Sequence, residues 1–118
     1  MKYMLLIYLD ENSLSEDQRG KCYAESAAYA RQLQAKGQLL SVGPLHPTST
    51  ATSVRIQDGK RIITDGPFAE TREQLGGFFL IAAENLDRAI QIAGEIPAGR
   101  WGTVEIRPVL EIGGLPAA

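Results

Sequence analysis

The segment Asp65-Gly66-Pro67-Phe68 holds the residue types best suited to chemistry in this chain of 118 residues. Proline restricts the residue before it to extended conformations, so we expect the Asp65 carboxylate to sit on a short, stiff turn. A carboxylate held beside a cleft can act as a general base when its pKa is raised. The interpretation that we favour is an Asx turn, in which the carboxylate accepts backbone N–H groups and shapes the loop.

His46 is the one histidine, in the sequence Leu45-His46-Pro47. Imidazole titrates near neutrality, so His46 could assist Asp65 as an acid or base if the two turns lie together. Solvent exposure on a loop is the favoured interpretation. One histidine and one cysteine do not make a structural zinc site, and the chain has no phosphate loop or dinucleotide fingerprint. We therefore expect neither a metal nor a cofactor.

Five further residues are candidate ligand contacts: Gly66, Pro67, Phe68, Glu70 and Arg55. A guanidinium such as that of Arg55 binds a carboxylate bidentately, although an ordinary strand-surface charge is the favoured interpretation. Phe68 could be a substrate platform, but we favour a hydrophobic plug. For Glu70, a place on a pocket rim and a solvated position with local ion pairs remain equally open.

The elements that position these residues follow from the pattern of apolar residues. Residues 2–9 and 77–83 are apolar on both faces of a period-2 pattern, which is typical of central strands. Ser15 and Gln18 form a capping box for a helix that ends at Gly37. A second helix over 86–96 should turn one stripe inward: Leu86, Ala89, Ile90 and Ala93.

Asp58-Gly59 predicts a tight hairpin between 53–57 and 60–64, which sets Val54 opposite Ile63 on a largely apolar face. A strand at 39–45 precedes this hairpin. A last strand over 103–112 should lie at a sheet edge, because Pro108 lacks a backbone donor.

This order of elements predicts one α+β domain over residues 1–118, a ferredoxin-like βαββαβ sandwich with an inserted β-hairpin. Two helices can cover only one face of its sheet. Because the central strands are apolar on both faces, we expect an identical subunit on the second face. The predicted partner is therefore a second copy, in a homodimer formed through sheet-to-sheet packing.

The stretch from Thr64 to Ile81, which reads TDGPFAETREQLGGFFLI, resembles the signature of the YCII-related, or DGPF-domain, family. The flanks agree: LSVGPLHP over 40–47, ATSVR over 51–55 and VEIRP over 104–108. The resemblance covers essentially the whole chain and implies a ferredoxin-like fold assembled as a dimeric α/β barrel. It also implies small bacterial proteins of undefined activity, some associated with extracytoplasmic-function sigma factors. A related branch is proposed to use a His-Asp pair, but Ser26 stands at the position of that histidine.

Charge and hydropathy exclude several classes of function. The formal net charge is -2 and no basic stripe is present, so neither DNA nor RNA is expected as a partner. The N-terminal apolar run is too short to span a bilayer and lacks a cleavage site, which favours the cytoplasm. We predict a protein that binds a small organic ligand in a dimeric α/β barrel, with cofactor-free acid/base chemistry at Asp65 and His46. The alternative is a non-catalytic ligand-sensing or protein-interaction module linked to sigma-factor regulation.

Overall fold

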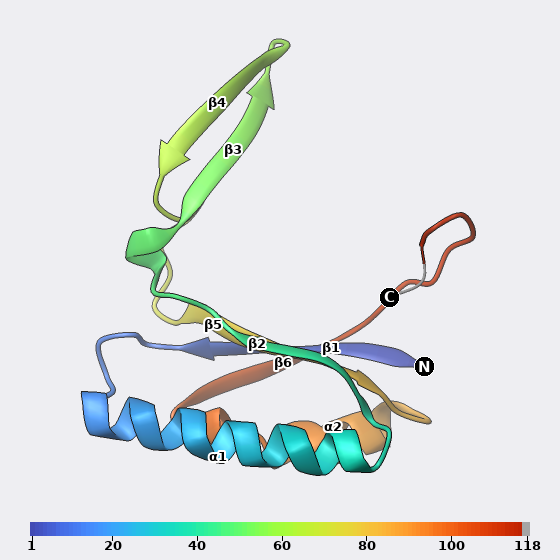
Figure 1. Ribbon diagram of the computed structural model, residues 1–118. Helices are drawn as coiled ribbons and strands as arrows, with labels where there is room; N and C mark the ends of the chain where they lie inside the picture. The colour runs from blue at the N-terminus through green and yellow to red at the C-terminus, as the bar shows by residue number, and fades with distance from the viewer. Residues whose placement is uncertain (117–118) are drawn as a thin grey trace.

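A computed structural model describes residues 1–116 and shows a sheet packed on two helices, with a hairpin standing apart from both (Figure 1). The elements are β1 (Lys2–Leu9), α1 (Glu16–Ala35), β2 (Leu39–Pro44), the 3₁₀ turn η1 (Thr48–Thr50), β3 (Thr52–Gln57), β4 (Lys60–Asp65), β5 (Gln74–Ala82), α2 (Leu86–Gly94), the 3₁₀ turn η2 (Pro97–Arg100) and β6 (Gly102–Pro108). The fold is α+β with antiparallel pairing, as predicted.

The main sheet has the strand order β2-β5-β1-β6, and all neighbours are antiparallel. The two strands predicted to be central, β1 and β5, are central. The last strand lies at an edge as predicted, but it ends at Pro108 rather than at residue 112. Because β1 and β2 both run antiparallel to β5, they are parallel to each other. Their carboxyl ends therefore meet at one edge of the sheet.

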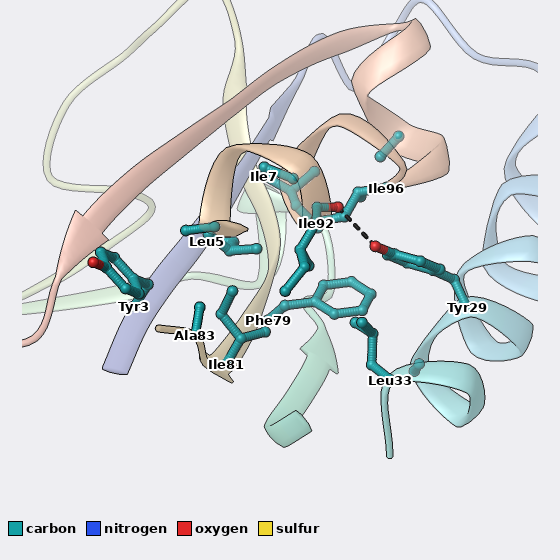
Figure 2. Close-up of a cluster of buried hydrophobic side chains, with 14 of the residues drawn as sticks. Tyr3, Leu5, Ile7, Tyr29, Leu33, Phe79, Ile81, Ala83, Ile92 and Ile96 are labelled. Atoms are coloured by element: carbon teal, nitrogen blue, oxygen red, sulfur yellow. Dashed lines mark hydrogen bonds between the residues drawn. The ribbon is translucent and has the colours of Figure 1, made fainter. Parts of the chain in front are cut away.

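The core lies between the sheet and the helices. Alternate residues of β1 and β5 point into it, including Leu5 and Ile81, which are fully buried. Tyr29 of α1 donates a hydrogen bond of 2.9 Å to the backbone carbonyl of Ile92 in α2, as Figure 2 shows, and its ring lies 6.2 Å from that of Phe79. The core thus joins both helices to the central strands.

Both helices begin at the predicted caps. Ser15 and Gln18 form the capping box of α1, and Asn85 caps α2 by accepting from the Arg88 N–H. The predicted inward stripe of α2 is partly wrong, because Ala89 and Ala93 are buried but Leu86 and Ile90 are half exposed. Ile92 is buried instead. Of the helices within residues 1–116, none is both long and apolar enough to cross a membrane.

Strands β3 and β4 pair with each other in a separate two-stranded sheet. Val54 lies opposite Ile63, as predicted. Asp58 and Gly59 have φ values of 51° and 74°, the left-handed conformations that a tight hairpin turn requires. In Figure 1 the hairpin rises from the side of the sheet opposite the helices.

The face of the main sheet turned away from the helices has no layer over it among residues 1–116 (Figure 1). Its central residues are half-buried and mostly apolar: Met4, Leu6, Phe78, Leu80 and Ala82. One edge of this open face is polar, where the Tyr8 hydroxyl donates to Glu105 Oε1 at 3.3 Å. Desolvation, reinforced by the Glu105 carboxylate, raises the pKa of Tyr8. The expectation that two helices cover only one face is confirmed.

Candidate functional site

A cleft of about 630 Å³ opens at the sheet edge where the parallel strands β1 and β2 both end. Its wall comes from the loop after β1, the first half of α1, the loop after β2 and the start of β5. The lining residues are Leu9, Glu11, Asn12, Leu14, Arg19, Cys22, Tyr23, Pro44, Leu45, His46, Pro47, Thr48, Ser49, Gln74 and Gly76. Its volume lies within the range of small-molecule pockets, about 300–1,000 Å³.

A hydrogen-bond network centred on Glu11 fixes one side of the cleft. The Glu11 carboxylate accepts the Thr48 backbone N–H at 2.7 Å and the Thr48 hydroxyl at 2.8 Å. Its backbone N–H donates to Gln74 Oε1 at 2.9 Å, and its backbone carbonyl accepts from Arg19 Nη2 at 2.9 Å. Because both of its oxygens are engaged, Glu11 holds the loops together rather than offering a free base.

His46 lies in this cleft, on the exposed loop after β2. Within residues 1–116 no hydrogen bond or ion pair engages its imidazole, so both ring nitrogens are free to meet a ligand. Cys22 also lines the cleft but is buried, and this burial raises the pKa of its thiol. A thiol with a raised pKa is a poor nucleophile at neutral pH. Of these two groups, only the imidazole suits acid/base chemistry.

Asp65 lies elsewhere. It is exposed at the end of β4 and does not line the cleft. Within residues 1–116 no hydrogen bond reaches its carboxylate, so the Asx-turn interpretation is wrong. The turn is closed instead by the Gly66 N–H, which donates to the Ala51 carbonyl at 2.7 Å, and by the Ser53 hydroxyl, which donates to the Gly66 carbonyl at 2.8 Å.

The other predicted contacts are also outside the cleft of their own chain. Arg55 is exposed on β3, and Pro67 and Glu70 are exposed beyond β4. Phe68 is 82% exposed, so it is not a plug in the core of this chain. Within residues 1–116 no group of three His, Cys, Asp or Glu side chains is placed to hold a metal ion.

Sequence reasoning missed the residues that share the cleft with His46, above all Glu11, Arg19 and Gln74. The signal that could have found them is topological. In the predicted ferredoxin-like order, the first and second strands are parallel, so residues 10–14 and 44–49 must follow strand ends at the same edge. His46 was singled out by its type alone, without this geometry.

The YCII-related domain model matches residues 1–113 of the chain. An uncharacterized protein of Rhizobium meliloti (strain 1021) is 36% identical over an alignment of 114 residues, and the match covers 92% of this chain and 92% of the relative. The chain belongs to the YCII-related domain family. The resemblance read from the central motif is therefore confirmed.

One solved structure resembles this YCII-related chain in fold. It is a 5-chloro-2-hydroxyhydroquinone dehydrochlorinase from Burkholderia phenoliruptrix AC1100, in complex with 2,5-dihydroxybenzoquinone. The TM-score is 0.56 with 18% sequence identity, over 93% of this chain and 94% of the other. At this identity the likeness concerns the fold.

Proposed function

We propose that this YCII-related protein binds a small organic molecule in the cleft beside His46. The observation that carries the proposal is the cleft itself, which is lined both by His46 and by the Glu11–Thr48 hydrogen-bond network. Its apolar surfaces come from Leu9, Leu14 and Leu45, and Arg19 and Asn12 add polar groups. Apolar walls with a few placed polar groups are the usual composition of a small-molecule site.

The chemistry that such a site supports is cofactor-free proton transfer. His46 would act as the general acid or base, because an imidazole exchanges protons near neutral pH. A hydroxylated ring compound is the first class of ligand to test, since the fold neighbour was solved with 2,5-dihydroxybenzoquinone. Fold likeness alone is a weak guide to substrate, so the warrant for the site remains the cleft geometry.

The working unit that we propose is a homodimer packed through the open face of the sheet. A compact protein of 12.8 kDa exposes about 6,300 Å². This chain exposes 8373 Å², an excess of about 2,000 Å². Obligate homodimers bury roughly 1,000–2,500 Å² on each subunit. The excess therefore matches what one stable interface would cover.

The test of the ligand proposal is a binding titration with 2,5-dihydroxybenzoquinone and related hydroxylated ring acids, read by calorimetry and thermal shift. The variant His46→Gln removes the imidazole but keeps hydrogen bonding, and His46→Trp adds bulk at the wall of the cleft. Lys36→Gln is the control, because Lys36 is exposed at the far end of α1. We expect His46→Trp to weaken binding at least tenfold and Lys36→Gln to leave it unchanged.

A turnover assay distinguishes an enzyme from a non-catalytic ligand-sensing protein. If a bound compound is converted by the wild type and only bound by His46→Gln, the acid/base assignment holds. Binding without conversion by the wild type would favour the ligand-sensing alternative. Equal affinities of the wild type and His46→Trp would show that the ligand lies elsewhere and would overturn the proposed site.

A further inference from the structure

The hairpin of β3 and β4, residues Thr52–Asp65, stands off the rest of the molecule and is called the arm here. Every residue of β4 is exposed, and on β3 only Ser53 is partly covered. The radius of gyration is 16.0 Å, whereas a compact domain of this length has about 13.5 Å. A two-stranded hairpin alone in water is marginally stable at best, so the arm lacks the surface that would stabilise it.

The two faces of the arm differ in character. Val54, Ile56 and Ile63 project from one face, which they share with Arg61 opposite Ile56, and all three apolar residues are more than half exposed. The opposite face carries Arg55, Gln57 and Lys60 around Ile62. An apolar face left in water on a protruding element marks an interaction site.

The root of the arm is fixed in place. The Gly66 and Ser53 bonds described above close its open end, and the Ala51 N–H donates to the Thr48 carbonyl at 3.0 Å. Thr48 in turn is held by both oxygens of Glu11. The direction in which the arm leaves the sheet is therefore fixed, which lowers the entropy that is lost on binding.

The direction of the arm indicates which surface it contacts. It rises on the same side of the sheet as the open face, and the chain after β6 leaves on that side too (Figure 1). We propose that the apolar face of the arm packs against the second copy of this chain, a contact that we call the clasp. This inference rests on the proposed homodimer. In a two-fold dimer each arm flanks the subunit seated on its own sheet, so the contact occurs twice.

The decisive comparison is between two neighbouring isoleucines on opposite faces of the arm. Ile63→Thr and Ile62→Thr make the same chemical change and keep a β-branched residue in the strand. Dimer dissociation constants are measured by sedimentation equilibrium, with circular dichroism as the check on folding. Burial of one aliphatic side chain is equivalent to about a tenfold change in affinity or more. Because the contact occurs twice, we expect Ile63→Thr to weaken the dimer at least tenfold and Ile62→Thr less than threefold.

Hydrogen exchange gives a second readout that needs no variant. The amides of β3 and β4 should be protected at concentrations where the dimer forms and should exchange rapidly in dilute monomer. Equal dimer affinities for the wild type and Ile63→Thr would overturn the clasp while leaving the dimer intact. A wild-type protein that is monomeric at 100 μM would overturn both the dimer and the clasp. Ligand binding in the cleft is tested by the separate titration described above, so its outcome does not depend on this result.

Discussion

Replacing Tyr29 by phenylalanine tests how α1 is fastened to α2. The ring packing against Phe79 is retained, so the variant removes little more than the hydroxyl and its bond to the Ile92 carbonyl. That carbonyl also accepts from the Glu95 N–H at 3.2 Å, so it keeps a partner. The expected loss is therefore about 1 kcal/mol of unfolding free energy at pH 8, near the mean for one hydrogen bond.

The same hydroxyl predicts a pH dependence. Burial, reinforced by the nearby Glu95 carboxylate, raises the pKa of Tyr29 to about 12 from its ordinary 10.0. Its contribution to stability is complete below the unfolded-state pKa and is lost as the pH rises through the folded-state value, by about 3 kcal/mol in all. About half of this is lost by pH 11. Tyr29→Phe has no such loss, so the wild type, more stable at pH 8, should become the less stable protein above about pH 11.

The assay is urea unfolding at a series of pH values from 8 to 11.5, followed by circular dichroism at one protein concentration. The informative quantity is the difference in unfolding free energy between the two proteins, because titration of the other tyrosines and of the lysines cancels in it. A difference that stays constant over the whole series would show that burial does not raise the pKa of Tyr29, and would refute this prediction.

Two glycines give further predictions. Gly77→Ala should lower the free energy of unfolding in urea by about 1–3 kcal/mol, because an added Cβ would lie 3.0 Å from the Gly43 carbonyl oxygen. The control is the neighbouring Gly76→Ala, where the nearest contact of an added Cβ is 3.7 Å. Equal losses in the two variants would contradict the steric explanation. Gly66→Ala should redirect the arm, since Gly66 has φ +110° with nothing within 4 Å of an added Cβ. We expect the dimer dissociation constant to rise while the melting temperature of the monomer changes little; an unchanged dimer would count against it.

Much of the fold could be predicted because the apolar pattern and the local chemistry agree. Residues apolar on both faces identified β1 and β5 as central, and Pro108 identified β6 as an edge strand. The side of α2 that faces the core could not be predicted in the same way. On this nine-residue helix Leu86 and Ile90 lie on one side of the buried Ala89 and Ala93, and Ile92 lies on the other side. Only packing against Tyr29 and the sheet decides between them.

The candidate site was harder to predict, because it depends on which loops converge. His46 could be named from its type, whereas Glu11 and Gln74 became relevant only when the sheet order brought their loops to one edge. For Asp65 the favoured Asx turn is wrong, because the turn is made by backbone and Ser53 bonds that do not involve the carboxylate.

The segment Asp65-Gly66-Pro67-Phe68 forms the root of the arm. Gly66 supplies a positive φ where the chain leaves β4, and its N–H and carbonyl groups close the hairpin against Ala51 and Ser53. Pro67 then stiffens the exit from the arm. Phe68 follows the arm and is 82% exposed in the part of the chain that the structure describes. In the proposed dimer, a second subunit held by the arm would bury both.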